Sequence, residues 1–159
     1  MTEPEAYRAP MRSRRDDVPP ESSIRRGLAH GLCGFGGVLD VAPDDLDTAV
    51  RMAADRYDDG LARRIARFAD VPDGAFAWTR DPDGLYWLGR LRGPWFYDAD
   101  PDARAVDLVH VRRCDWQHRP VPPTEAPPAV LATFARGGRN FQRIRDDGVG
   151  AASLRIWAR

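Results

Sequence analysis

The chain has 159 residues, of which 43% are hydrophobic and 30% charged, a size and composition that fit one domain with its own core. Acidic and basic residues balance at 24 each, so no overall field points to nucleic acid or to a membrane surface. Every one of the 24 basic residues is arginine. The lack of lysine excludes a Walker-type phosphate lysine, a Schiff-base lysine and a lysine general base. What remains is the planar guanidinium group, which suits phosphate binding and stacking on rings.

The balanced total hides an uneven distribution. Residues 118–159 carry seven arginines against three acids, a surplus of four, and residues 1–117 carry the matching deficit. The C-terminal quarter is therefore the basic part of the chain.

Two cysteines, Cys33 and Cys114, are too few for a disulfide framework. Residues 1–21 are polar and proline-rich, unlike a signal peptide, and no apolar run is long enough to span a bilayer. We expect a cytoplasmic protein with no membrane partner.

Residues 1–23 are rich in proline, arginine, acids and serine, and such a segment buries too little surface to offset its ordering entropy. We expect a disordered or loosely ordered tail there, followed by a single domain over residues 24–159.

A glycine-rich segment follows at residues 24–39. It does not match a dinucleotide-binding loop, because the third glycine of that motif is absent after Gly34-Phe35-Gly36. The simpler interpretation is a first strand over Leu28 to Cys33 with a tight glycine turn. The alternative is a loop that also lines a pocket.

Residues 44–69 carry apolar side chains at three- and four-residue spacing, the pattern of an amphipathic helix. Asp44 or Asp45 is the expected N-cap. Asp58-Asp59-Gly60 is expected to divide the segment into two helices, with Asp59 capping the second. The nearby Arg63, Arg64 and Arg67 fit a solvated helix face better than a binding site.

Residues 74–116 hold four of the five tryptophans, and apolar runs of strand length alternate there with proline, aspartate and glycine turns. This pattern predicts consecutive antiparallel strands, as in a meander or small barrel.

In the C-terminal part of the chain, Pro127 or Pro128 can start a helix that ends at Gly137-Gly138, and Asn140 can cap one more turn. Residues 149–159 fit a closing strand or a docked tail.

Catalysis is disfavoured. Each pair of adjacent aspartates has an ordinary role at a helix cap or turn, and no Ser/His/Asp arrangement stands out. A metal site from His110, Cys114 and His118 would need ligands that lie about 13 Å apart when four residues separate them on a strand. We therefore expect neither an enzyme nor a cofactor.

Three short motifs have a counterpart in a known family: Pro72-Asp73-Gly74, Leu88-Gly89-Arg90-Leu91, and His110-Val111-Arg112 followed by Trp116. In this order the chain resembles the PUA-like superfamily, and within it the EVE-related domains of bacterial restriction systems, over residues 24–145. One departure is that the family's opening aromatic strand is replaced by the glycine-rich Gly31 to Gly37. The resemblance implies an α+β fold, namely a small antiparallel β-barrel with two or three flanking helices.

The resemblance also implies a non-catalytic nucleic-acid-binding domain that reads a flipped or modified base of DNA or RNA in an aromatic pocket, alone or beside an effector protein. Stacking on an aromatic ring contributes about 1–3 kcal/mol per base, which helps to offset the cost of extruding it. The acid-free run from Arg136 to Arg145 would supply the phosphate contacts. The candidate nucleic-acid-binding residues are Phe35, Trp78, Arg80, Trp95, Tyr97, Trp116, Arg136, Arg139, Asn140 and Arg143.

Other interpretations stay open. Core packing competes with pocket lining for each aromatic residue, and a solvated surface or an acidic protein partner competes with phosphate for the arginines. The alternative function is a protein-interaction or accessory module that uses surface aromatics and an arginine-rich face.

Overall fold

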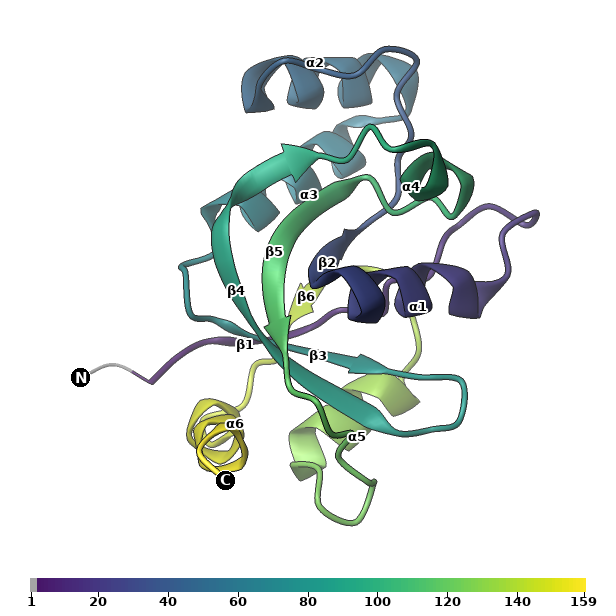
Figure 1. Ribbon diagram of the computed structural model, residues 1–159. Helices are drawn as coiled ribbons and strands as arrows, with labels where there is room; N and C mark the ends of the chain where they lie inside the picture. The colour runs from purple at the N-terminus through teal and green to yellow at the C-terminus, as the bar shows by residue number, and fades with distance from the viewer. Residues whose placement is uncertain (1–2) are drawn as a thin grey trace.

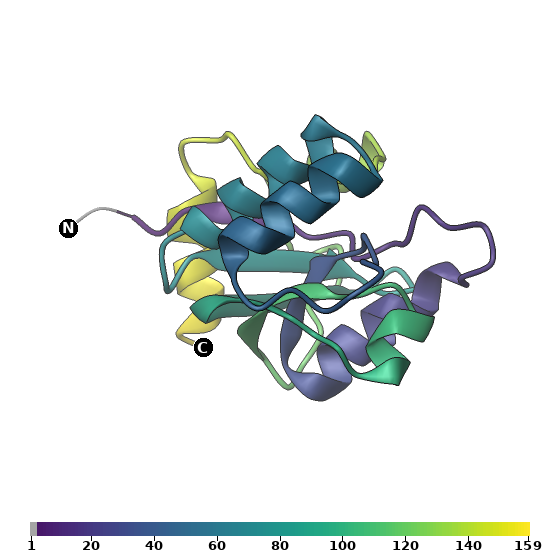
Figure 2. The ribbon, with the colours of Figure 1, turned by 90° about the horizontal axis from the view of Figure 1, so that it is seen from above.

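A six-stranded mixed sheet forms the centre of the computed structural model, which describes residues 3–159 (Figure 1). The strands are β1 (Ala6–Arg8), β2 (Leu32–Phe35), β3 (Phe76–Arg80), β4 (Tyr86–Tyr97), β5 (His110–Trp116) and β6 (Gln142–Arg143). The helices are α1 (Pro20–His30), α2 (Leu46–Arg56), α3 (Asp59–Asp70), α4 (Pro101–Ala105), α5 (Pro128–Ala135) and α6 (Val149–Trp157). Figure 2 shows α2 and α3 on one side of the sheet and α1 and α4 on the other.

The sheet is open, so the prediction of a small PUA-like barrel is wrong. Its order is β2-β5-β4-β3-β1-β6, and the two outer strands, β2 and β6, do not pair with each other. The β1–β3 pair is parallel and the other pairs are antiparallel. The antiparallel centre β3-β4-β5 was expected. What the pattern missed is that β1 and β6 extend one edge instead of closing a cylinder, and that six helices accompany the sheet.

The N-terminal segment differs from the loose tail that its composition predicts. β1 pairs with both β3 and β6, and Ala6, Ala9 and Met11 are buried. A strand of three residues in polar surroundings carries almost no sequence signal, because its pairing partners supply its stability.

The glycine-rich segment begins with a helix and not with a strand. α1 ends at Gly31, whose left-handed conformation (φ 66°) closes the helix, and β2 starts one residue later. Leu28 therefore belongs to α1, while Leu32 and Cys33 belong to the strand.

The two-helix prediction for residues 44–69 is confirmed. Asp45 caps α2 by accepting a hydrogen bond from the amide of Thr48 at 2.8 Å. Asp58, and not Asp59, caps α3 through the amide of Leu61 at 2.7 Å. Each cap accepts from the third residue after it, the usual N-cap geometry.

The C-terminal region matches the prediction in part. The helix after Pro127 is α5. Asn140 does not cap a helical turn, because β6 follows it, and residues 149–157 form α6 instead of a strand. In the described part of the chain no helix is long and apolar enough to cross a membrane.

A buried guanidinium joins the end of α3 to the sheet. Arg112 of β5 is 1% exposed, and it donates to the carbonyl groups of Phe68, Val71 and Gly93 at 2.6–3.1 Å. Its remaining contact is a 2.7 Å ion pair with Asp73. The last carbonyls of a helix lack intrahelical donors, so Arg112 gives the Val71 carbonyl a donor and adds a second one to the Phe68 carbonyl, which also accepts from the Val71 amide.

Replacing this side chain is expected to destabilise the fold strongly. Arg112→Met keeps much of the volume, but it removes the donor of the Val71 and Gly93 carbonyls and leaves the Phe68 carbonyl with the Val71 amide alone, so we expect a loss of about 3–5 kcal/mol in urea unfolding. Arg92→Met is the control, because Arg92 is largely exposed on β4 and pairs with the exposed Asp115. It should change stability by about 0.5 kcal/mol or less; equal losses for the two variants would contradict the assigned role of Arg112.

Candidate functional site

Three adjoining cavities rich in arginine follow the segment from Gly137 to Arg145. The first, of about 240 Å³, is lined by Gly137 and Gly138, and the second, of about 300 Å³, by Arg139, Asn140 and Phe141. The third, of about 640 Å³, is lined by Phe141 and by residues on to Arg145. Arg12 belongs to both the first and the second cavity, and Arg64 to both the second and the third. We call the three cavities together the arginine track. A fourth cavity, of about 580 Å³, adjoins the third at Arg143 and Arg145 and is acidic, with Glu3, Glu5, Asp146 and Asp147 in its lining.

The arginine track is positively charged on a chain with no net charge. Ten arginines line it against six acids, a surplus of four. The arginines are Arg8, Arg12, Arg14, Arg15, Arg64, Arg67, Arg80, Arg139, Arg143 and Arg145. Two of them are neutralised, Arg15 by Asp17 and Arg143 by Glu5. Over residues 3–159 no carboxylate lies within 4.0 Å of the other eight guanidinium groups, so most of this charge is available to an anionic ligand.

One of those eight, Arg8, has a structural role. It is 5% exposed, and it donates to the carbonyl groups of Thr133 and Gly137 at 3.1 and 2.6 Å. It also reaches the Asn140 carbonyl and the Gln142 side chain at 3.3 and 3.0 Å. Arg8 therefore ties the end of α5 and the following segment to β1, and it fixes the wall of the arginine track.

The central cavity combines cations with aromatic rings. Phe35, Tyr57, Leu61 and Phe141 supply its apolar lining. The ring of Phe141 is itself held in place, since it stacks on Tyr7 with centroids 4.9 Å apart and planes 10° apart.

Positive charges crowd together around this cavity. The pKa of Arg64 is lowered, first by partial burial and then by the neighbouring Arg14. Arg14 donates a hydrogen bond to the side chain of Asn140, which links the N-terminal segment to the opposite wall. Asp58 opposes this lowering only in part, and the remaining repulsion between arginines favours an anion in the cavity.

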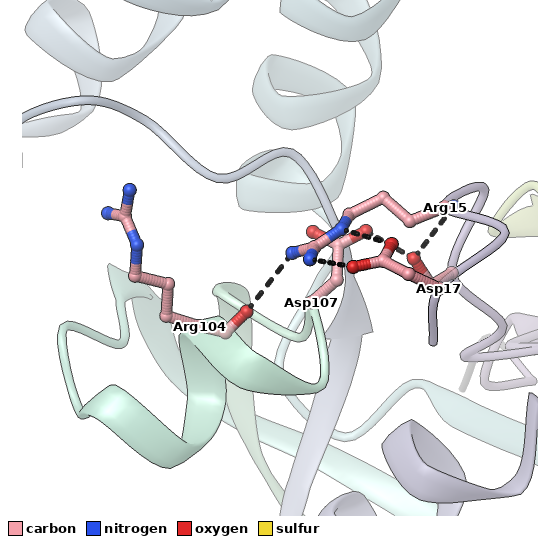
Figure 3. A network of polar contacts seen from close by, with 5 residues as sticks. Arg15, Asp17, Arg104 and Asp107 are labelled. Atoms are coloured by element: carbon pink, nitrogen blue, oxygen red, sulfur yellow. Dashed lines mark hydrogen bonds and ion pairs between the residues drawn. The ribbon is translucent and has the colours of Figure 1, made fainter. Parts of the chain in front are cut away.

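A carboxylate lies at the base of the same cavity. Asp107, which follows α4, is 5% exposed and adopts a left-handed backbone conformation (φ 55°). It accepts hydrogen bonds from the Ser13 hydroxyl at 2.5 Å and from the Gly37 amide at 3.0 Å. A side chain at Gly36 would place its Cβ 2.3 Å from the Asp107 carboxylate, so only glycine fits there. Beside Asp107, Arg15 pairs with Asp17 and donates to the Arg104 carbonyl at 3.4 Å (Figure 3).

Five of the ten predicted site residues lie along the arginine track. Arg80 lines the first cavity, Phe35, Arg139 and Asn140 the second, and Arg143 the third. The loop at Gly36-Gly37 lines the second cavity as well, which agrees with the alternative interpretation of the glycine-rich segment.

The four predicted pocket-wall rings do not converge on one cavity. Trp78 is fully buried and donates to the Ser153 hydroxyl at 3.0 Å. Trp116 is half-buried and donates to the Leu32 carbonyl at 3.0 Å. Trp95 and Tyr97 line a separate cavity of about 420 Å³ whose charged lining residues are Asp44 and Asp45, a poor setting for phosphate. Arg136, the tenth predicted residue, is exposed and lines none of the three cavities of the track.

Sequence reasoning missed several lining residues of the central cavity. Arg12 and Arg14 lie in the segment taken for a loose tail, and Arg64 was assigned to a solvated helix face. Tyr57 lies within the predicted helical segment of residues 44–69 and Asp107 within the predicted strand region of residues 74–116, and neither pattern marks them as site residues. Arg64 stands six residues after the cap Asp58, which also lines the cavity, and both side chains lie next to Gly60.

The glycine loop packs on a buried, neutral histidine. The Nε2–H of His110 donates to the Gly37 carbonyl at 2.9 Å, and the ring contacts Phe35, Trp95 and Tyr97. Burial lowers the pKa of His110 from its ordinary 6.5 to about 4, against the opposing effects of the Gly37 carbonyl and of Asp107. His110 therefore holds the glycine loop through this hydrogen bond and stays uncharged at neutral pH.

Within residues 3–159 no three side chains of histidine, cysteine, aspartate or glutamate are grouped so that they could hold a metal ion. No protein-family model matches the chain, and no curated protein or solved structure is significantly similar to it. The resemblance to the PUA-like superfamily thus gains no support from these comparisons.

The buried His110 predicts a specific loss of stability in acid. Its folded pKa lies below its unfolded pKa, so the unfolded chain binds more protons between pH 6.5 and pH 4. The stability that it contributes is complete above pH 6.5, and about 3 kcal/mol is lost by pH 4.

His110→Phe removes this titration, so its unfolding free energy, measured with urea, should fall by about 3 kcal/mol less than that of the wild type over this range. His118→Phe, at an exposed position, is the control and should follow the wild type. Identical pH profiles for wild type and His110→Phe would contradict the assignment.

Proposed function

We propose that this chain binds single-stranded nucleic acid, DNA or RNA, along the arginine track and catalyses no reaction on it. The observation that carries the proposal is the run of three adjoining cavities whose linings combine arginines, most of them without an ion pair, with aromatic rings. Five residues selected from the sequence as nucleic-acid ligands lie on this run.

The arginines match a chain of phosphates. A guanidinium group binds phosphate through two parallel hydrogen bonds, and it keeps its charge at any physiological pH. Arg12, Arg64, Arg67, Arg139 and Arg145 have no carboxylate within 4.0 Å in the described structure, so no internal ion pair has to break when phosphate binds. The linings of the three cavities carry a surplus of four positive charges, which allows binding by a protein whose total charge is zero.

The rings match the bases. The central cavity offers Phe35, Tyr57 and Phe141, and its volume of about 300 Å³ is at the lower end of that of small-molecule sites. Stacking of one base on an aromatic face contributes about 1–3 kcal/mol and tolerates any sequence. Alternating cations and rings is the general design of proteins that bind single strands.

A single-stranded nucleic acid fits the arginine track better than a duplex does. A duplex keeps its bases paired and stacked, whereas the bases of a single strand can be splayed into separate cavities. The track is built from loops, from the short edge strand β6 and from one side of α3, which contributes Leu61, Arg64 and Arg67 to the second and third cavities.

A surface of clustered aromatics, on which the alternative function depends, is not favoured. The large hydrophobic residues that are most exposed are Val41, Tyr57 and Leu154, on three different elements or loops. A protein-binding hot spot requires such residues to gather at one centre.

The proposal predicts a salt-dependent affinity that specific arginines control. For a fluorescent single-stranded oligonucleotide, the logarithm of the association constant should fall linearly with the logarithm of salt concentration. Each phosphate contact contributes about 0.7 to this slope, so the double variant Arg64→Ala/Arg139→Ala should reduce the slope by about 1.4 and weaken binding at low salt at least tenfold.

Arg92→Ala/Arg113→Ala is the matched control. It removes the same charge from exposed positions on β4 and β5, outside the three cavities, and should leave the slope within about 0.3 of the wild-type value. No binding at low salt, or equal effects of the two double variants, would refute the proposal. Preferential binding of an acidic protein over the oligonucleotide would favour the protein-interaction function instead.

A further inference from the structure

The central cavity of the arginine track contains a hydrogen-bond acceptor that phosphate binding does not explain. The Asp107 carboxylate accepts one hydrogen bond on each oxygen, from Ser13 on Oδ2 and from the Gly37 amide on Oδ1. An ionised carboxylate can accept about four hydrogen bonds, so each oxygen keeps capacity for another donor. Among residues 3–159 no arginine or histidine nitrogen lies within 4.0 Å of it, although five arginines line the same cavity.

The carboxylate is also held in a fixed position. The left-handed backbone of Asp107, the two hydrogen bonds and the missing Cβ of Gly36 together determine where its oxygens lie. A buried carboxylate whose oxygens keep unused acceptor capacity gains from a further hydrogen-bond donor. The complement of this acceptor is a ligand with N–H donors.

Hydrogen-bond donors and aromatic rings line the rest of the cavity around the Asp107 carboxylate. Arg12, Arg14, Arg64 and Arg139 present donors, and Phe35, Tyr57 and Phe141 present rings. A ligand that satisfies the whole cavity is planar, carries two N–H donors on one edge, carries acceptors on another edge and is attached to phosphate.

We infer that this cavity selects guanine within the bound strand, an inference that rests on the proposed function. Guanine carries N1–H and the N2 amino group side by side, at a spacing that matches the two oxygens of a carboxylate. Its O6 and N7 are acceptors that pair with a guanidinium group. Adenine and cytosine each offer one amino group, and thymine and uracil place carbonyl oxygens on both sides of a single N–H, which a carboxylate repels.

The test compares labelled single-stranded pentanucleotides that differ in the central base among thymine flanks. The central base is guanine, hypoxanthine, adenine or thymine. Hypoxanthine differs from guanine only in lacking the N2 amino group, so it isolates one hydrogen bond to a charged acceptor. We expect guanine to bind about tenfold more tightly than hypoxanthine, and the other two bases to bind no better than hypoxanthine.

The preference should disappear in Asp107→Asn, because the amide presents a donor to the guanine donors. Asp115→Asn is the matched control, since it makes the same change of charge at an exposed position on β5, and it should keep the tenfold preference. If Asp107→Asn fails to fold, the inference is tested on the wild type alone, by the base series and by amide NMR. The oligonucleotide with guanine should then shift the amide signals of Gly36 and Gly37 more than the oligonucleotide with hypoxanthine.

Equal binding of guanine and hypoxanthine by the wild type would overturn the inference and leave the proposed function standing. A guanine preference that survives in folded Asp107→Asn would also overturn it. Failure of every oligonucleotide to bind at low salt would refute the inference and the proposed function together.

Discussion

Two buried guanidinium groups hold this fold together at the points where helices meet the sheet. Arg112 on β5 donates to carbonyl groups at the end of α3, and Arg8 on β1 donates to carbonyl groups at the end of α5 and beyond it. Helix C-termini leave carbonyls unpaired, and a buried unpaired carbonyl is costly. A guanidinium group satisfies several of them at once through its rigid fork of donors, which the compact ammonium of lysine matches poorly.

Arg8 connects this structural role to function. Because both terminal nitrogens of Arg8 donate to Thr133 in α5 or to the segment that follows this helix, Arg8 positions the wall of the arginine track without having to bind a ligand itself. Arg12, Arg64 and Arg139 lie around it or farther along the track with no ionic partner among the described residues. In a chain without lysine, burial and backbone contacts thus separate the arginines that build the fold from those that are free to bind phosphate.

Local features were predictable from the sequence and long-range ones were not. The helices α2, α3 and α5 follow from apolar spacing, aspartate caps and proline, all of which act within a few residues. β1 could not be predicted, because it is stabilised by a partner about 70 residues away, and closure of the sheet was misjudged for the same reason. At the site, Arg139 and Asn140 were identified from an acid-free run, whereas Asp107 was missed because only the fold brings it next to the glycine loop.

The most direct test of the central claim is a map of ligand contacts by two-dimensional amide NMR, with a short single-stranded oligonucleotide titrated at low salt. The account predicts that the shifted signals follow the arginine track, from Gly137 through Phe141 to Arg145 and including Gly36 and Gly37. Signals of β5 around Asp115 should not move. Shifts centred on the separate cavity of Trp95 and Tyr97, or no shifts anywhere, would contradict it.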